Sequence, residues 1–144
     1  MVSISLGECR RILMRDDLMV QQQVDNSWQH MVGVICLNQT SRKQVKSVLP
    51  KLFGICPTPV HYLNTLPETI KMIIQPLGMV NVREKRLRQM SKDYLTWDGE
   101  DATQLYGIGK YGSDSYELFY KKRVPENIGD HELKRYVEEE FYAV

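Results

Sequence analysis

The stretch Leu105-Tyr-Gly-Ile-Gly-Lys-Tyr-Gly112 carries the most specific pattern in this chain of 144 residues. A Gly-x-Gly turn that opens a helix exposes backbone N–H groups, which can hold a phosphate at the positive end of the helix dipole. A second segment, Asp130-His-Glu-Leu-Lys-Arg135, places a carboxylate where another helix is expected to begin. The sequence thus predicts a phosphate-binding turn and, twenty-one residues after Gly109, a carboxylate at the start of another helix.

The length and composition favour one folded domain over residues 1–144. Hydrophobic residues make up 42% of the chain and charged residues 26%, with a net charge of +1, which is typical of a globular domain. The longest apolar run, residues 31–37, is too short to span a bilayer, and no signal peptide is apparent, so we expect an intracellular protein. The cysteines number three. This odd count favours reduced thiols and excludes a four-cysteine iron–sulfur cluster.

Helical periodicity dominates the chain, and no alternating strand pattern of any length is present. The sequence therefore predicts an all-α domain of about nine or ten helices. Ser27 and Ser41 are expected to cap two of them, and Pro50 to bend or end one. The main helical segments are expected near residues 12–25, 27–37, 41–52, 60–64, 66–74, 82–95, 110–120 and 130–141. The apolar segment 27–37 should be the buried central helix.

The Leu-x-Gly-Ile-Gly turn, followed by an Asp-x-x-Leu-x-Arg segment, resembles the helix-hairpin-helix DNA glycosylases related to endonuclease III. The runs Gly107–Tyr116, Cys36–Ser41 and Gln75–Val80 are most similar to the mismatch thymine/uracil glycosylases associated with methyl-CpG-binding proteins. The resemblance implies a fold of two helical lobes with an active site in the groove between them, here without an iron–sulfur cluster. It also implies that the partner is double-stranded DNA containing a mispaired or modified pyrimidine.

The resemblance assigns Asp130 as the catalytic carboxylate that stabilises an electron-poor sugar while the base departs. Family members that also cut the strand carry a lysine where this chain has Tyr111, so a monofunctional enzyme is expected. Such an enzyme would remove uracil or thymine opposite guanine and leave an abasic site. Two alternatives stay open: an enzyme of the same fold acting on a modified pyrimidine, and a non-catalytic DNA-binding module. From the residues alone, Asp130 could be only a helix cap, and Tyr111 only a packing residue.

The remaining candidate residues divide into pocket and DNA contacts. Gln21 and Glu132 are expected in the base pocket with Tyr111, and Gln39 and Met79 where the family inserts side chains into DNA, although both could be ordinary loop ends. The expected contacts to the DNA backbone are Gly107, Gly109, Lys110, Gly112, Arg83 and Lys85. The histidines show no metal-ligand spacing. No cofactor is expected beyond a monovalent cation that the family often holds at the hairpin, and we expect a monomer.

Glu132 departs from the resembled family, which carries a lysine there. A carboxylate facing the base would oppose the negative charge of a departing pyrimidine. The sequence therefore predicts that Glu132 points away from the pocket or weakens activity on thymine relative to uracil.

Overall fold

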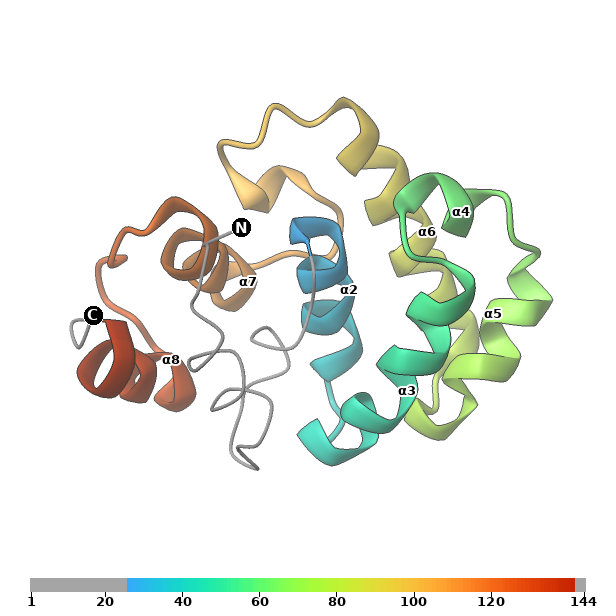
Figure 1. The fold of residues 1–144 in the computed structure, drawn as a ribbon, viewed down its shortest axis with the longest axis horizontal. Helices are drawn as coiled ribbons and strands as arrows, with labels where there is room; N and C mark the ends of the chain where they lie inside the picture. Colours follow the sequence, from blue (N-terminus) through green and yellow to red (C-terminus); the bar gives the residue numbers. More distant parts are fainter. Residues whose placement is uncertain (1–25, 142–144) are drawn as a thin grey trace, which may run out of the picture.

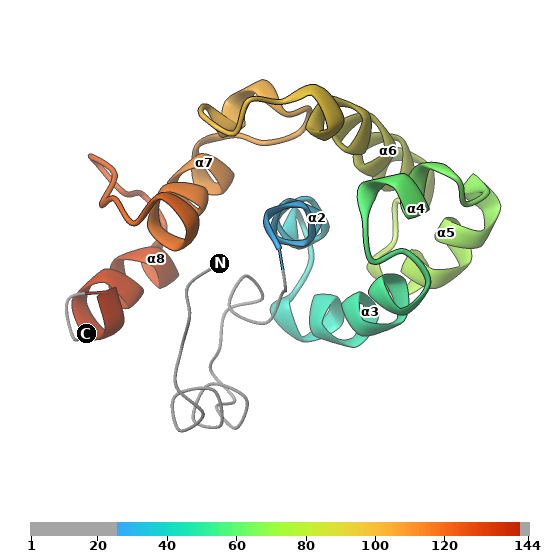
Figure 2. The same ribbon diagram turned by 45° about the horizontal axis from the view of Figure 1, so that its top comes forward.

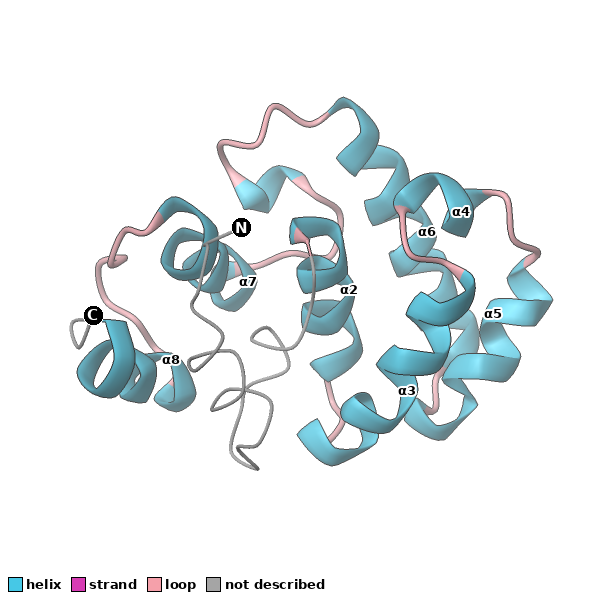
Figure 3. Ribbon diagram, in the orientation of Figure 1, coloured by secondary structure: helices cyan, strands magenta, loops and turns pink. Residues whose placement is uncertain are grey.

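The computed structural model describes residues 26–141, and this part of the chain consists of helices and loops with no strand (Figures 1 and 3). The α-helices are α2 (Ser27–Leu37), α3 (Arg42–Ile55), α4 (Pro59–Leu63), α5 (Pro67–Ile74), α6 (Val80–Thr96), α7 (Lys110–Tyr116) and α8 (His131–Tyr136). Short 3-10 turns cover Gln75–Leu77 and Ala102–Gln104, and π-helical turns at Glu117–Lys121 and Val137–Phe141 extend α7 and α8. The predicted all-α class is confirmed. None of the described helices is long and apolar enough to cross a membrane.

Helix α2 is the central element of the fold, as the apolar segment predicted. Every residue from Trp28 to Cys36 is buried, because α3 and α6 pack on one side of α2 and α7 on the other (Figure 2). The cap differs from the prediction. Asn26, rather than Ser27, caps the helix by accepting a hydrogen bond from the backbone N–H of Gln29 at 2.9 Å.

Helix α3 begins as predicted and ends later than expected. Ser41 and Gln44 form a reciprocal capping box, which satisfies two backbone donors at the helix start. The helix continues through Pro50 to Ile55, so the proline does not end it. Buried residues lie on both sides of the proline, including Val48 and Leu52. Their packing offsets the backbone hydrogen bond that proline cannot donate.

The described residues form a larger lobe and a smaller one, with α2 between α3–α6 and α7–α8 (Figure 1). The larger core joins buried residues of α2 to α7, Trp28, Leu52, Ile70 and Leu87 among them. A separate small core forms around Leu118 and Leu133. Because α2 contacts both α6 and α7, its C-terminal end lies where the lobes meet.

Candidate active site

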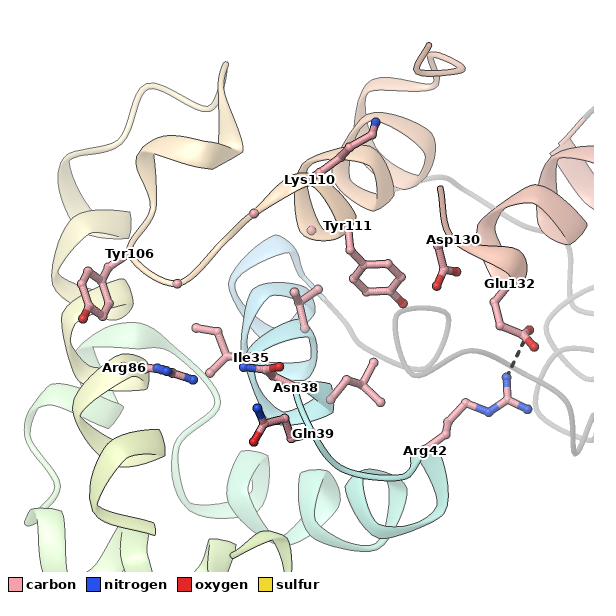
Figure 4. A pocket seen from close by; sticks show the side chains of 15 residues that line it. Ile35, Asn38, Gln39, Arg42, Arg86, Tyr106, Lys110, Tyr111, Asp130 and Glu132 are labelled. Atoms are coloured by element: carbon pink, nitrogen blue, oxygen red, sulfur yellow. Dashed lines mark hydrogen bonds and ion pairs between the residues drawn. The ribbon is translucent and has the colours of Figure 1, made fainter. Parts of the chain in front are cut away.

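A pocket of about 1030 Å³ lies where the two lobes meet (Figure 4). Its walls come from the C-terminal end of α2, the start of α3, α6, the hairpin before α7, and the start of α8. The lining residues are Val34, Ile35, Leu37, Asn38, Gln39, Arg42, Arg86, Tyr106, Gly107, Gly109, Lys110, Tyr111, Gly112, Asp130 and Glu132. The fold therefore brings the hairpin and the Asp130 segment to one cavity.

Asp130 is both a helix cap and a pocket residue. Its Oδ2 accepts a hydrogen bond from the backbone N–H of Leu133 at 2.9 Å, which fixes the carboxylate at the start of α8. The side chain is half-buried, and it points toward the cavity beside Tyr111 (Figure 4). The two interpretations of Asp130 are thus compatible, since capping uses one oxygen and leaves acceptor capacity on the carboxylate. A carboxylate held in this way can stabilise positive charge that develops in the pocket.

The glycines of the hairpin serve different geometric needs. Gly107 has φ +83°, a backbone conformation that a side chain disfavours. A Cβ at Gly112 would lie 2.7 Å from Cγ2 of Ile108 and 3.1 Å from Cγ1 of Val34, so Gly112 lets α7 pack closely on the turn and on α2. At Gly109, by contrast, a Cβ would meet nothing within 4 Å. Gly109 is exposed, and this side of the turn is open to a ligand.

A buried histidine joins α2 to α7 behind the hairpin. Nε2 of His30 lies 2.7 Å from Oγ of Ser115, and this hydroxyl donates to the carbonyl of Gly112 at 2.9 Å. Burial lowers the pKa of His30 to about 3, so the imidazole is neutral at physiological pH. Within the described part of the chain Nδ1 has no hydrogen-bond partner. The neutral His30–Ser115 bond holds α7, and with it the hairpin, against the central helix.

Tyr111 and Lys110 point to different sides of the hairpin helix. Tyr111 is directed into the cavity, whereas the Lys110 side chain extends away from it (Figure 4). The ammonium group of Lys110 pairs with Asp114 Oδ2 at 2.8 Å and donates to the carbonyl of Glu126 at 3.3 Å. Adjacent residues on a helix diverge by about 100°. The lysine next to the predicted pocket tyrosine is therefore engaged elsewhere.

Gln39 and Met79 occupy two loop tips with the same unusual backbone. Both residues are non-glycine with positive φ, +61° at Gln39 and +48° at Met79, and both are exposed. Such residues are strained by roughly 1–3 kcal/mol and gather at functional sites. Gln39 also lines the pocket, whereas Met79 lies outside its lining. The geometry suits side chains presented to a partner at the edge of the cavity.

Arg83 does not occupy the surface position that the sequence suggested. Its side chain is buried, with 2% exposed, so it cannot meet a DNA phosphate in this structure. Its guanidinium instead donates to three backbone carbonyls, those of Gly78 at 2.9 Å and of Ile35 and Cys36 at 3.4 Å. Arg83 thus ties the loop that carries Met79 to the end of α2, next to Gln39. Lys85 is exposed, as a phosphate contact requires.

Glu132 lines the pocket but is not an unopposed negative charge. Its Oε2 accepts from Arg135 at 2.9 Å and from Arg42 at 3.4 Å. Figure 4 shows the Arg42 bond reaching from α3 to α8. Of the two alternatives predicted for Glu132, the structure has it lining the pocket rather than pointing away, so weakened activity on thymine stays a prediction and must be considered together with Arg42.

Several pocket residues escaped the sequence analysis. Four of them line the cavity, namely Asn38, Arg42, Arg86 and Tyr106. Their positions in the sequence could have indicated them, since Asn38 precedes Gln39, Arg42 and Arg86 belong to basic runs, and Tyr106 precedes the first hairpin glycine. Gln21 lies outside the described residues. No group of three or more His, Cys, Asp or Glu side chains that could hold a metal occurs within residues 26–141. The cation expected at the hairpin would bind to carbonyl oxygens and stays a prediction.

Comparison with known proteins agrees with this architecture. Residues 32–141 match the model of the HhH-GPD superfamily base excision DNA repair proteins. A methyl-CpG-binding domain protein 4-like protein of Arabidopsis thaliana is 33% identical over 123 residues, which cover 83% of this chain and 27% of the relative. A thymine/uracil-DNA glycosylase of Pyrobaculum aerophilum is 28% identical over 127 residues, covering 83% of this chain and 55% of the relative. The chain thus spans only part of these relatives, but the match covers its hairpin and its Asp130 segment, and the chain belongs to the HhH-GPD superfamily of base excision DNA repair proteins.

Proposed function

We propose that this protein is a monofunctional DNA glycosylase that removes uracil or thymine paired with guanine and leaves an abasic site. The observation that carries the proposal is the position of Asp130 and Tyr111 in one cavity at the hairpin. The name of the Pyrobaculum relative, a thymine/uracil-DNA glycosylase, supports the choice of bases.

In the proposed reaction, the target nucleotide leaves the duplex and enters the pocket, where its base contacts Tyr111. The bond between the sugar C1′ and the base nitrogen breaks, and its electron pair departs with the pyrimidine. The Asp130 carboxylate stabilises the resulting positive sugar and orients a water molecule toward C1′. The water oxygen bonds to C1′ and its proton passes to Asp130, while the departed pyrimidine anion takes up a proton from solvent.

The hairpin supports the proposed absence of strand cleavage. A lyase step needs an amine that attacks C1′ and forms a Schiff base. Tyr111 has no amine, and Lys110 is paired with Asp114 on the side of α7 away from the pocket. Hydrolysis by water is then the reaction available to the site.

DNA contact is proposed for three separate features. The exposed Gly109 turn offers backbone N–H groups to a phosphate. Gln39 and Met79, both at strained loop tips, would fill the space left by the flipped nucleotide and support the opposite base. Lys85 would add a phosphate contact. A monomer suffices for this arrangement, because every feature comes from one chain.

The test is a panel of duplexes in which guanine faces uracil, thymine or a 5-substituted pyrimidine. After incubation, each sample is divided and one half is treated with alkali, which cuts at abasic sites. We expect alkali-dependent cleavage for uracil and thymine and none without alkali. Cleavage confined to 5-substituted pyrimidines would support the modified-base alternative. DNA binding without base release from any duplex would indicate a non-catalytic module.

A further inference from the structure

The structure joins the two lobes across the pocket through a network of four charged side chains. Glu132 of α8 pairs with Arg42 of α3 at 3.4 Å and with Arg135 of its own helix at 2.9 Å. Arg135 also pairs with Glu139 at 3.5 Å and does not line the pocket, whereas Arg42 and Glu132 do. The Glu132 charge is thus offset from two sides, and Arg42 is the cation of this network that faces the cavity.

The location of Arg42 is not explained by helix stability. It is the first residue of α3, directly after the Ser41 cap, and the first turn of this helix contains no acidic residue. A cation at this end opposes the helix dipole. Its side chain is one-third exposed, so the guanidinium is only partly solvated. Helix stability therefore does not account for this charge, whose partner Glu132 lies on α8 across the pocket.

Resting on the function proposed above, we propose that Arg42 stabilises the negative charge of the departing pyrimidine and that Glu132 holds its guanidinium in place. The pyrimidine leaves with the electron pair of the broken bond, and its charge resides largely on the carbonyl oxygens. A guanidinium has five N–H donors, and within residues 26–141 Arg42 uses one of them, on Glu132. The others remain to meet a base oxygen.

Among the described residues, the other two cations that line the pocket are less suited to this role. Lys110 is bonded to Asp114. Arg86 extends from α6 on the side of Tyr106 and Gln39, whereas Arg42 and Glu132 lie on the side of Asp130 (Figure 4). The base leaves from a sugar that faces Asp130, so Arg42 is the better placed cation.

The proposal predicts a change in how the rate depends on the leaving group. Single-turnover rates are measured for guanine opposite 5-fluorouracil, uracil and thymine, which are progressively poorer leaving groups. Arg42→Met should slow the release of 5-fluorouracil only slightly and should slow the release of thymine by about tenfold more, because the poorer leaving group depends more on charge stabilisation. Arg42→Lys keeps the charge and should restore much of the thymine rate. Glu132→Gln should lower the release rates less than Arg42→Met does, again most for thymine and least for 5-fluorouracil, because the Arg42 guanidinium loses the carboxylate that holds it.

Lys43→Met is the matched control, because Lys43 is the next cation on the same helix turn, is exposed and does not line the pocket. Its removal should change all three rates by one common factor. If Arg42→Met also lowers all three rates equally, Arg42 is a lobe strut or a phosphate contact and the proposal is overturned. If the wild-type protein releases none of the three bases, the proposed function itself fails. Thermal unfolding of each variant shows whether it is folded.

Discussion

The two lobes support their pocket residues in different ways. In the larger lobe, which has an extensive core, buried Arg83 donates to the backbone just before both loops, at Ile35 and Cys36 before Gln39 and at Gly78 before Met79. In the smaller lobe, Asp130 and Glu132 stand at the start of the six-residue helix α8. The core beneath it, in the part of the chain described, centres on Leu118 and Leu133.

This difference suggests a division of roles. The loops proposed to contact DNA are fixed by buried hydrogen bonds, which are costly to break. The proposed catalytic carboxylate is fixed by one capping bond, and its neighbour Glu132 by partly exposed ion pairs. Substitutions that remove the support of the Gln39 and Met79 loops should therefore change folding and DNA binding first, whereas those at the start of α8 should change the chemical step.

The largest effect is expected at Asp130. Asn is as good a helix cap as Asp, so Asp130→Asn should leave the fold and DNA binding nearly intact. Loss of the carboxylate charge should slow base release by about a hundredfold or more, roughly 3 kcal/mol. Single-turnover kinetics and a binding titration on the same duplex measure the two quantities.

Asp101→Asn provides a control for that substitution. Asp101 caps a 3-10 turn by accepting from the N–H of Thr103 and lies outside the pocket lining. Its replacement should leave base release close to the wild-type rate. Near-normal release by Asp130→Asn would remove Asp130 from the mechanism and erase the distinction between the lobes.

Arg83→Met tests whether the buried Arg83 holds the Gln39 and Met79 loops of the larger lobe in place. The substitution removes three hydrogen bonds from a buried cation, and we expect the free energy of unfolding to fall by about 2 kcal/mol. The Gln39 and Met79 loops also lose their common anchor, so DNA binding should weaken. Urea denaturation and a binding titration check both effects.

Lys85→Met is the comparison for Arg83, because Lys85 is exposed on the same helix. The free energy of unfolding of the Lys85→Met variant should change by no more than about 0.5 kcal/mol, while the affinity of the variant for DNA should become less sensitive to salt. Equal stability losses in the two variants would show that burial of Arg83 does not distinguish it from a surface cation.

His30 should make the connection between the lobes sensitive to acid. Burial holds the folded-state pKa of His30 at about 3, below its ordinary value of 6.5, so the unfolded state binds the proton more readily. The contribution of His30 is therefore fully present above about pH 6.5 and is lost as the pH falls toward 3, at up to about 1.4 kcal/mol per pH unit. The difference in unfolding free energy between wild type and His30→Gln, measured across this range, isolates the effect from that of the carboxylates.

Ser115→Ala separates the hydrogen bond of His30 from its burial. The variant keeps the buried imidazole and loses its Oγ partner. Stability should fall at every pH while the acid dependence persists. A wild-type curve that parallels His30→Gln between pH 6.5 and 3 would contradict the assignment.

The last expected outcome is a negative result in a trapping experiment. Borohydride added during turnover should trap no covalent protein–DNA adduct, because Tyr111 has no amine and Lys110 is paired with Asp114. A bifunctional glycosylase of the same superfamily is the positive control. A trapped adduct that is lost in Lys110→Gln would show that this lysine turns toward the sugar and that the enzyme is bifunctional.

Local patterns in the sequence were sufficient for most of the fold. The apolar segment 27–37 predicted a central helix, and Ser41 predicted a cap, because both depend on neighbouring residues. The cap at Asn26 was missed because Asn and Ser are both good caps and stand side by side. The continuation of α3 past Pro50 depends on core packing, which no local pattern expresses.

The candidate site was only partly predictable. The hairpin spacing and Asp130 identified two walls of the pocket, because their residue types and separation are specific. Arg83 and Lys85 looked equivalent in one basic run, and only the packing of α6 shows that the first is buried and the second exposed.

By itself, the sequence determined the all-α class, the hairpin and the carboxylate that opens the last helix, since each is written in residues close together in the chain. The tertiary structure alone decided that Glu132 meets Arg42, ninety residues away. It also decided that the Arg83 side chain is buried and donates to backbone carbonyls beside the Gln39 and Met79 loops, instead of lying on the surface. The physical reason is that the effective charge of a side chain depends on its burial and its partners, and these are set by helices that come together only when the chain folds.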